Sequence, residues 1–309
     1  MSDAGPLGGN MPLVDAHAHF LHAGAGRADW RRVNDARFRA GEAIGVTYHV
    51  ASVLGSYGHT SPTYFPSPED VSRGNDAMAE IARAEPERVR WYATVNPNHT
   101  AHALAELQRC RQQGAVGIKL LASRRADDPL LDPICDAAKE YRFPVLHHIW
   151  QHRTREWPNQ EISDGRDLAK LAVRHPAVSF ILAHIGGGGD WAHTLAAVRD
   201  IPNVYPDLSG SGVDRGMLDA AVAALGTRRL LWACDLTMET GLAKLRALEV
   251  IGLSTDDLAD IRWRNASRLF GADVFPRCVA ETTARVASAP HDRLRDVHRT
   301  VPLSRAAAS

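Results

Sequence analysis

The stretch DAHAH, residues 15–19, closes the short apolar run MPLV, residues 11–14, and decides how the chain is interpreted. Side chains two residues apart in a β-strand point the same way, so we expect His17 and His19 to present two imidazoles to one point in space. Two neutral imidazoles at this spacing form half of a zinc-type site. A His-x-His pair alone is a weak signal of a metal site, and the rest of the sequence gives it weight.

The composition is that of an ordinary globular protein. The chain has 309 residues, 45% of them hydrophobic, which suits either one α/β barrel or two smaller domains. Lysine plus arginine and aspartate plus glutamate both total 36, so bulk charge does not indicate a nucleic-acid or membrane partner. The cysteines are scattered without a Cys-x-x-Cys pair, which favours free thiols. We see no signal peptide or membrane-spanning stretch and expect a soluble, cytoplasmic protein.

Short apolar segments bounded by glycine, proline or polar residues predict eight buried parallel strands. These segments are Leu13–His19, Val46–Leu54, Arg90–Asn96, Val116–Leu121, Val145–Ile149, Ser179–Ile185, Val204–Leu208 and Leu230–Asp235. Amphipathic segments between them predict helices. These are Val71–Ala84 with Ser67 as its cap, Asp127–Arg142, Asp164–Arg174, Asp190–Arg199, Asp214–Leu225 and Ser254–Phe270.

This alternation predicts a (β/α)8 TIM barrel of the α/β class. We expect one barrel domain over residues 11–275, a flexible tail at residues 1–10, and a C-terminal extension at residues 276–309. The extension is expected to be a short helix followed by disorder. A doubly wound open sheet is the rival architecture, but in it the polar residues at the strand ends would not converge.

Reactive side chains of a barrel lie at the C-terminal ends of its strands, and here polar residues occupy those positions. The first predicted strand ends in His17 and His19, the fourth in Lys119, the fifth in His147-His148, the sixth in His184 and the eighth in Asp235. Burying so many polar groups is costly unless they bind a metal ion or form hydrogen bonds with one another. The whole pattern therefore predicts a divalent metal site.

Six motifs carry a resemblance to a known family. They are VDAHAHF (14–20), GIKL (117–120), PVLHH (144–148), ILAHIGG (181–187), LLWACD (230–235) and NASRLFG (265–271). With them the chain resembles the amidohydrolase superfamily, most closely its amidohydrolase-related branch, which includes aminocarboxymuconate-semialdehyde decarboxylase-like enzymes. As an ordered set the motifs are specific for the fold and the metal site and poor guides to the substrate.

The resemblance implies that His17, His19, His148 and Asp235 bind the metal. Asp235 would also accept a proton from a metal-activated water, and His184 would act as acid or base, or as a ligand where two metals bind. His147 is expected to point to the opposite side of its strand and to pack there, although a one-residue slip would exchange it with His148.

Lys119 and Asp15 are two further polar residues of this pattern. The resemblance allows Lys119 to be carbamylated and to bridge two metals. We favour an ion-pair or substrate-binding lysine instead, since a bare ammonium group repels a divalent cation. Asp15 is expected to share the face of His17 and His19, to lie deeper, and to orient the imidazoles as a hydrogen-bond acceptor.

This donor set leaves an open coordination position and supports hydrolysis of a small amide, lactone or ester through a metal-activated water. The alternative is non-oxidative decarboxylation or hydration of a small unsaturated carboxylic acid on the same site. Zinc is the expected metal and manganese the alternative, with one ion per chain favoured over two. A metal-free barrel serving as a binding protein is disfavoured because the full ligand set is present.

Two loops carry candidate substrate-binding residues. The loop Gly55–Pro66 contains His59 and Tyr64, and the segment Trp150–Glu161 contains Trp150 and Arg153. An arginine fork suits a carboxylate, although a solvated charged loop is the commoner explanation. The backbone of residues 186–189 is either an anion cradle or a tight turn. We expect a small-molecule substrate and no nucleic-acid or membrane partner, and the sequence leaves a homo-oligomer open.

Overall fold

The computed structural model describes residues 11–23, 28–53, 61–150, 159–212, 216–236 and 238–288. In this part of the chain, seven parallel strands form one curled sheet in the order β1-β2-β3-β4-β5-β6-β7. The strands are β1 (Val14–Phe20), β2 (Tyr48–Val53), β3 (Val89–Val95), β4 (Gly117–Leu120), β5 (Val145–His148), β6 (Phe180–Ala183) and β7 (Val204–Pro206). A doubly wound sheet reverses its strand order, so the sequential order excludes that rival.

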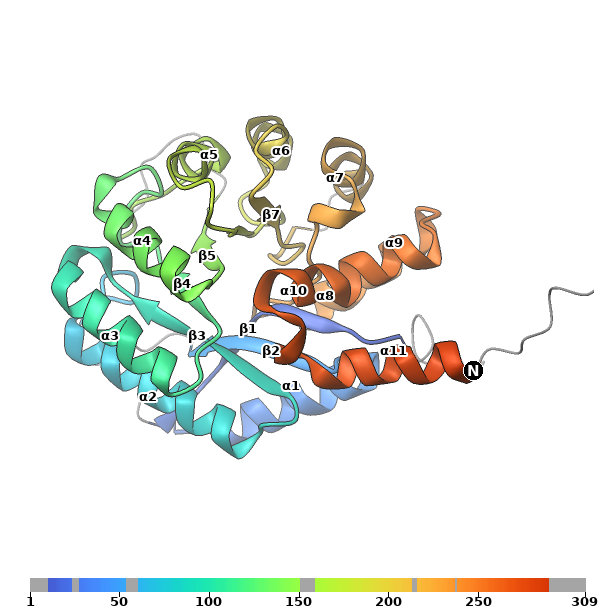
Figure 1. Cartoon of the computed structure of the whole chain (residues 1–309), viewed down its shortest axis with the longest axis horizontal. Coiled ribbons are helices and arrows are strands. Elements are labelled where there is room, and N and C mark those ends of the chain that lie inside the picture. Colours follow the sequence, from blue (N-terminus) through green and yellow to red (C-terminus); the bar gives the residue numbers. More distant parts are fainter. Residues whose placement is uncertain are drawn as a thin grey trace, which may run out of the picture.

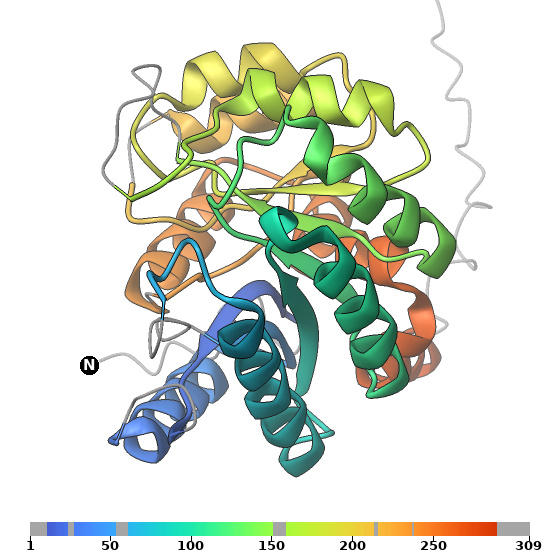
Figure 2. The same cartoon turned by 90° about the vertical axis from the view of Figure 1, so that its left-hand side faces the viewer.

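Helices surround the sheet on its outer side (Figures 1 and 2). They are α1 (Trp30–Ile44), α2 (Pro68–Ala84), α3 (Thr100–Gln112), α4 (Asp132–Tyr141), α5 (Gly165–Arg174), α6 (Trp191–Val198), α7 (Met217–Leu225), α8 (Met238–Val250), α9 (Thr255–Ala259), α10 (Asn265–Phe270) and α11 (Pro276–Ser288), with a π-helical turn at Asp260–Arg264. The predicted caps are present: the Ser67 hydroxyl accepts from the Asp70 amide at 3.2 Å, and Asp164 forms a capping box with Asp167.

The predicted eighth strand, Leu230–Asp235, is not a regular strand. It makes isolated bridges instead, at Leu231 beside β7 and at Asp235 beside β1. The Leu208 amide donates to the carbonyl of Leu231 at 2.9 Å, and the Asp235 amide donates to the carbonyl of His17 at 2.7 Å. The structure is therefore a curled seven-stranded sheet in which this segment lies between the first and last strands.

Side chains of the sheet divide into an interior layer and a layer against the helices. Leu146 belongs to the interior cluster together with Tyr48 and Tyr92, whereas its neighbour Val145 belongs to the cluster shared with the helices. Phe270 and Phe275 join the interior cluster, and Phe275 packs against Tyr48, the first residue of β2. Residues of α10 and the start of α11 thus close the N-terminal end of the sheet and leave the C-terminal ends of the strands for a site.

An irregularity in β1 controls which residues face this site. Asp15 pairs with His49 of β2 and Ala18 pairs with Ala51, so β1 advances by three residues where β2 advances by two. Such a bulge places one extra residue in the strand and reverses the alternation of its faces. As a result, Asp15 lies on the opposite face from His17 and His19.

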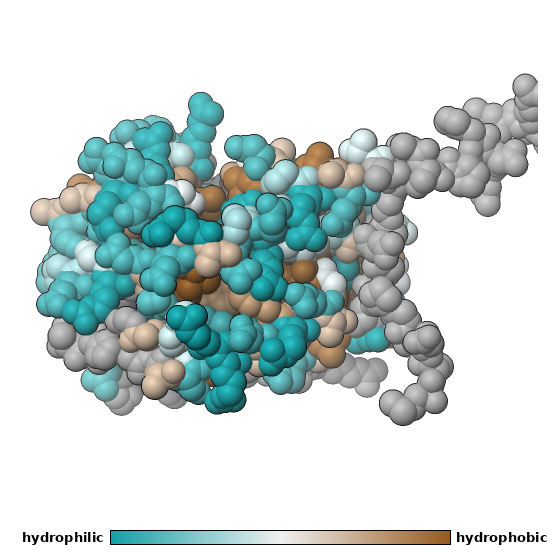
Figure 3. Space-filling model, turned by 90° about the horizontal axis from the view of Figure 1, so that it is seen from below, coloured by the Kyte–Doolittle hydropathy of each residue, from teal (hydrophilic) through white to brown (hydrophobic). Residues whose placement is uncertain are grey.

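The outer parts of the molecule add little to the site. Every helix in the described ranges is too short or too polar to cross a bilayer. The face seen in Figure 3 is largely hydrophilic, with hydrophobic residues gathered near its middle. Cys278 is fully buried, so the first residues after Pro276 pack against the rest of the described structure. The tails at residues 1–10 and 289–309 lie outside the described residues.

Candidate metal centre

His17 and His19 face each other at the end of β1. Their Nε2 atoms are 3.1 Å apart. The Nδ1 atom of His17 lies 3.0 Å from Oδ2 of Asp207, and that of His19 lies 3.3 Å from the carbonyl oxygen of Ser52. The carboxylate of Asp207 calls for a proton on Nδ1 of His17, which leaves Nε2 of that ring unprotonated, and the carbonyl of Ser52 is an acceptor for the same tautomer of His19. A cation bound between the two Nε2 atoms would relieve the repulsion of two lone pairs at this distance, as would a hydrogen-bond donor beside them.

Asp235 completes the group. Its Oδ1 lies 3.0 Å from Nε2 of His19 and 3.5 Å from Nε2 of His17, and its Oδ2 lies 3.3 Å from Nε2 of His184. One ligand atom from each of His17, His19 and Asp235 lies within 4.8 Å of the other two. The backbone of Asp235 has a φ of 56°, which costs a non-glycine residue about 1–3 kcal/mol. The surrounding structure therefore has to hold this residue in place.

The protonation states suit metal binding. Burial, assisted by the charge of Lys119, lowers the pKa of His17, and burial lowers the pKa of His19 to about 4. Burial by itself raises the pKa of Asp235, but His17, His184 and His19 together outweigh it and hold that pKa well below its usual range. Near neutral pH the group therefore presents two neutral imidazoles and a carboxylate, which are the ligand forms of these side chains.

Lys119 lies directly beside this group. Its Nζ is 2.9 Å from Nε2 of His17, and the side chain is buried. Burial lowers the pKa of Lys119 to about 8. The ammonium group thus donates to the same lone pair that a metal would use, so a metal ion and a protonated Lys119 compete for His17.

The two adjacent histidines of β5 point in opposite directions, as the strand pattern predicts. His147 is fully buried, and its Nδ1 lies 2.9 Å from the carbonyl oxygen of His148. His148 points toward the site, with its ring 5.3 Å from that of His184. The Nε2 of His148 is buried and has no hydrogen-bond partner among the described residues. His148 lies outside the compact group of His17, His19 and Asp235.

Aromatic rings line the site next to His148. The ring of Tyr64 is 5.5 Å from that of His148, and the ring of Trp150 is 6.0 Å from it and nearly parallel. Trp150 also lies 6.1 Å from His184, edge to face. Burial, with a contribution from Asp235, raises the pKa of Tyr64, so its phenol stays protonated near neutral pH. Tyr64 and Trp150 thus form an aromatic wall beside His148.

Three other expectations for the loops have different outcomes. His59 and Arg153 lie outside the described residues. Two amides of the predicted anion cradle are already used, because those of Gly186 and Gly187 donate to the carbonyls of Ser209 and His184. A Cβ on Gly187 would lie 2.1 Å from Nδ1 of His184, so a glycine is required here for close packing against that ring.

The expectation for Asp15 is wrong. Because of the bulge in β1, its Oδ2 accepts from Nδ1 of His49 at 3.0 Å and from Nη2 of Arg37 at 3.2 Å, on the side of α1. It makes no hydrogen bond to His17 or His19 in the described structure. The acceptors that orient those two imidazoles are Asp207 and the backbone of Ser52.

Asp207 was missed by the sequence analysis, although it lies next to a predicted strand end. It is completely buried, and its Oδ1 accepts from both the amide and the hydroxyl of Ser209. Burial opposes ionisation of Asp207, but the neighbouring His17 outweighs it and lowers the pKa. The signal that could have found it is a carboxylate in the otherwise apolar run Val204–Leu208, since a buried carboxylate requires a partner.

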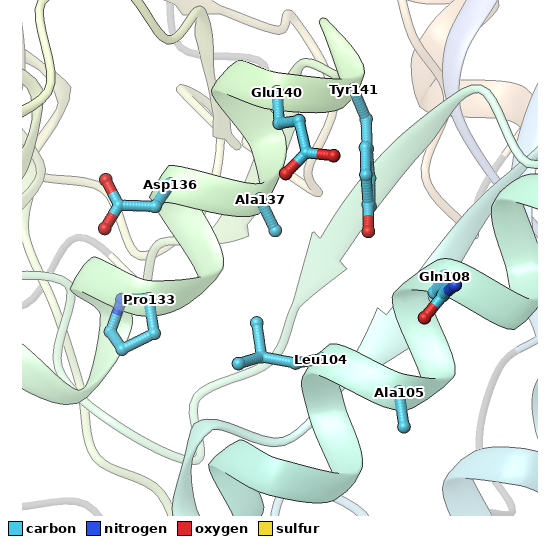
Figure 4. Close-up of a pocket in the computed structure, with 8 residues that line it drawn as sticks. All are labelled: Leu104, Ala105, Gln108, Pro133, Asp136, Ala137, Glu140 and Tyr141. Atoms are coloured by element: carbon cyan, nitrogen blue, oxygen red, sulfur yellow. The ribbon is translucent and has the colours of Figure 1, made fainter.

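A hollow of about 460 Å³ lies elsewhere, on the outside of the helical layer (Figure 4). Its lining comes from α3 and α4 alone, and includes Leu104, Asp136, Glu140 and Tyr141. None of His17, His19, His148 and Asp235 lines it, so it is separate from the group at the strand ends.

The amidohydrolase family matches residues 14–272, which is most of the chain. The chain belongs to the amidohydrolase family. A curated relative is gamma-resorcylate decarboxylase of Polaromonas sp. (strain JS666 / ATCC BAA-500), 24% identical over 249 residues that cover 65% of this chain and 76% of the relative.

Solved structures of decarboxylases share the TIM-barrel-like fold of this amidohydrolase. 2,6-Dihydroxybenzoate decarboxylase from Rhizobium is 18% identical with a TM-score of 0.66, over 85% of this chain and 99% of that one. Dihydroxybenzoic acid decarboxylase from Polaromonas sp. JS666, with bound manganese and 2-nitroresorcinol, is 19% identical with a TM-score of 0.64, over 85% and 98%. 5-Carboxyvanillate decarboxylase from Sphingomonas paucimobilis is 18% identical with a TM-score of 0.62, over 84% and 99%.

These comparisons correct the expected reaction. The sequence analysis favoured a hydrolase, and that expectation is wrong because the relatives named above are decarboxylases. The comparisons support the expectation that the chain is an enzyme, and they favour decarboxylation, which the sequence analysis gave as the alternative reaction. Zinc as the expected metal also lacks support, since the named relative with a bound metal holds manganese.

Proposed function

We propose that this amidohydrolase is a metal-dependent, non-oxidative decarboxylase of a small aromatic hydroxy acid. The observation that carries the proposal is the group of His17, His19 and Asp235 beside an aromatic wall formed by Tyr64 and Trp150. The names of the relatives support the same reaction class. In this reaction the bond between the ring and the carboxylate breaks, CO₂ leaves, and a proton takes its place on the ring, so no oxidant or reductant is needed.

The donor set fits a divalent cation. His17 and His19 turn their Nε2 atoms toward each other, 3.1 Å apart, and the carboxylate of Asp235 lies 3.0 Å from that of His19. Imidazole and carboxylate ligands suit manganese as well as zinc, and we propose manganese, one ion per chain. His148 is proposed as a further ligand because its ring lies 5.3 Å from that of His184, on the side of the site, and its buried Nε2 lacks a partner among the described residues. When bound, the cation supplies positive charge that polarises the substrate's oxygen atoms.

The residues around the donors supply the other requirements of the reaction. The faces of Trp150 and Tyr64 are proposed to hold a flat ring, since aromatic rings prefer stacked or edge-to-face contacts. Lys119, when protonated, attracts the carboxylate of an incoming acid. His184, whose Nε2 lies 3.3 Å from Oδ2 of Asp235, is proposed to carry the proton that replaces CO₂ on the ring.

We also propose that Leu230–Asp235 acts as the eighth strand of a closed barrel. Its backbone bonds to β7 at Leu231 and to β1 at Trp232 and Asp235 support this. In such a barrel Asp235 would lie beside His17 and His19 because the first and eighth strands are neighbours.

The test is to incubate the manganese-loaded full chain with 2,6-dihydroxybenzoate and related hydroxybenzoates, and in parallel with simple lactones and amides. We expect release of CO₂ and of the corresponding phenol, and none from a His17→Ala/His19→Ala variant. A folded, metal-loaded chain that releases no CO₂ from any hydroxybenzoate while opening a lactone or amide would contradict the proposal.

A further inference from the structure

Arg37, on the side of α1 that faces the sheet, reaches the backbone of the candidate ligand Asp235. Its Nη2 donates to the carbonyl oxygen of Asp235 at 2.7 Å, and its Nη1 donates to that of Leu236 at 3.2 Å. The arginine is buried, with 9% of its surface exposed. A buried guanidinium that donates hydrogen bonds to two successive carbonyls fixes the backbone conformation at those two residues.

Asp15 links this arginine to the residue that precedes Asp235. Its Oδ2 accepts from Nη2 of Arg37 at 3.2 Å, and its Oδ1 accepts from the amide of Cys234 at 2.9 Å. Asp15 is completely buried, and His49 donates to it from the neighbouring strand at 3.0 Å. Asp15 and Arg37 therefore bond to the backbone before and after Asp235, and both lie on the face of β1 opposite the site.

The backbone at Asp235 requires such support. With a φ of 56° it adopts a left-handed conformation that residues with a Cβ rarely adopt. On the side of β1, the Asp235 amide donates to the carbonyl of His17 at 2.7 Å. That bond fixes the amide of Asp235, and the bond from Arg37 fixes its carbonyl. Together the two bonds hold the backbone from which the Asp235 side chain projects.

We infer that Arg37 and Asp15 are positioning residues for the metal: they hold the carboxylate of Asp235 beside His17 and His19 through the backbone, without contacting the ligand side chains. The inference rests on the proposed metal centre and does not depend on which acid is the substrate. The inference also gives a role to the bulge in β1, which places Asp15 on the face away from the metal ligands although it is close to them in sequence.

The experiment measures Mn²⁺ affinity of the full chain by competition with a fluorescent chelator, together with thermal unfolding of the metal-free protein. The variants are Arg37→Met, Arg37→Lys and Asp15→Asn. The control is Arg88→Met, because Arg88 stacks on Phe38 of α1 and pairs with Glu42 without contacting Asp15 or Asp235. We expect Arg37→Met to raise the Kd for Mn²⁺ by about tenfold or more. Arg37→Lys, which keeps one charged donor, should raise it less, and Arg88→Met should leave it within about twofold.

A merely structural role would lower the unfolding temperature and leave the Kd unchanged. Arg37→Met with the wild-type Kd, or Arg88→Met with the same loss of affinity, would overturn the inference. If Arg37→Met does not fold, the test depends on Arg37→Lys and Asp15→Asn. A wild-type Kd for Mn²⁺ in both of these variants would overturn the inference. A wild-type chain that binds no Mn²⁺ would overturn the metal centre itself, whereas failure of decarboxylation alone leaves this binding experiment intact.

Discussion

The carboxylate of Asp207 lies 3.0 Å from Nδ1 of His17 and thereby determines which nitrogen of that ring faces the site. Asp207 is fully buried and is held in turn by Ser209. Acceptors of this kind fix the tautomer and orientation of a ligating imidazole and raise its basicity.

Replacing Asp207 by asparagine should therefore weaken metal binding. An asparagine amide donates as well as accepts, so it no longer enforces a proton on Nδ1 of His17. We expect Asp207→Asn to raise the Kd for Mn²⁺ by roughly 10–100-fold, measured by chelator competition. The matched control is Asp200→Asn, an exposed residue paired with Arg199. Equal affinities in the two variants would remove Asp207 from the metal centre.

The adjacent histidines of β5 offer a second, internally controlled prediction. His148→Gln should lower both Mn²⁺ affinity and the rate of CO₂ release by about tenfold or more, since the proposed ligand is lost. His147→Gln should lower the unfolding temperature and leave the Kd for Mn²⁺ unchanged, because His147 is buried and shares its face of β5 with Val145, which packs in the cluster shared with the helices. A loss of metal affinity in His147→Gln with none in His148→Gln would show that the assignment of the two faces is reversed.

Much of the fold was accessible from the sequence because buried parallel strands and capped helices have strong local signals. The seven strands start within two residues of their predicted positions, and Ser67 and Asp164 cap the helices expected of them. Leu230–Asp235 was predicted as a strand on the same grounds, but its isolated bridges arise from non-local pairing with β7 and β1. Local pattern carries no information about such pairing.

The site shows the same division between local and non-local information. The convergence of His17, His19 and Asp235 was expected from strand ends, whereas the surroundings of Asp15 were not. One extra residue in β1 reverses the alternation after Asp15, and nothing in the run of alternating side chains marks the bulge. Asp207 acts on His17 across 190 positions of sequence, so only the fold could pair them.

Trp150 is predicted to determine preference for a flat substrate. Its ring lies nearly parallel to that of His148, at 6.0 Å. We expect Trp150→Ala to raise KM for an aromatic acid by about tenfold, since about 1–2 kcal/mol of ring contact is lost. Trp150→Phe should retain most of the affinity, and Mn²⁺ binding should be unchanged in both variants. An unaltered KM in Trp150→Ala would place the substrate elsewhere.

Removal of the metal should abolish the reaction reversibly. Chelation of the full chain is expected to stop CO₂ release, and addition of Mn²⁺ to restore it, because the single charge of Lys119 does not replace a divalent cation that polarises the substrate's oxygen atoms. Elemental analysis should give about one metal per chain, and none in His17→Ala/His19→Ala. Full activity in the chelated protein would exclude the proposed role of these ligands.

Lys119 makes metal affinity depend on pH in a definite direction. Burial lowers its pKa to about 8, so below that pH its ammonium group donates to Nε2 of His17 and repels a cation, and above it the repulsion is lost. His19, with a pKa of about 4, stays neutral throughout this range. Mn²⁺ affinity of the wild type should therefore rise between pH 7 and pH 9, by up to about tenfold per pH unit below the pKa.

The control for this dependence is Lys119→Met. Without the ammonium group, the affinity should be nearly flat over the same range and higher than that of the wild type at pH 7, because the competitor for the lone pair of His17 is gone. Weaker metal binding in Lys119→Met would point to a different role for this lysine. If Lys119→Met binds metal more weakly, and the wild type holds about two ions per chain, then Lys119 is a carbamylated bridging ligand and the one-metal proposal is wrong.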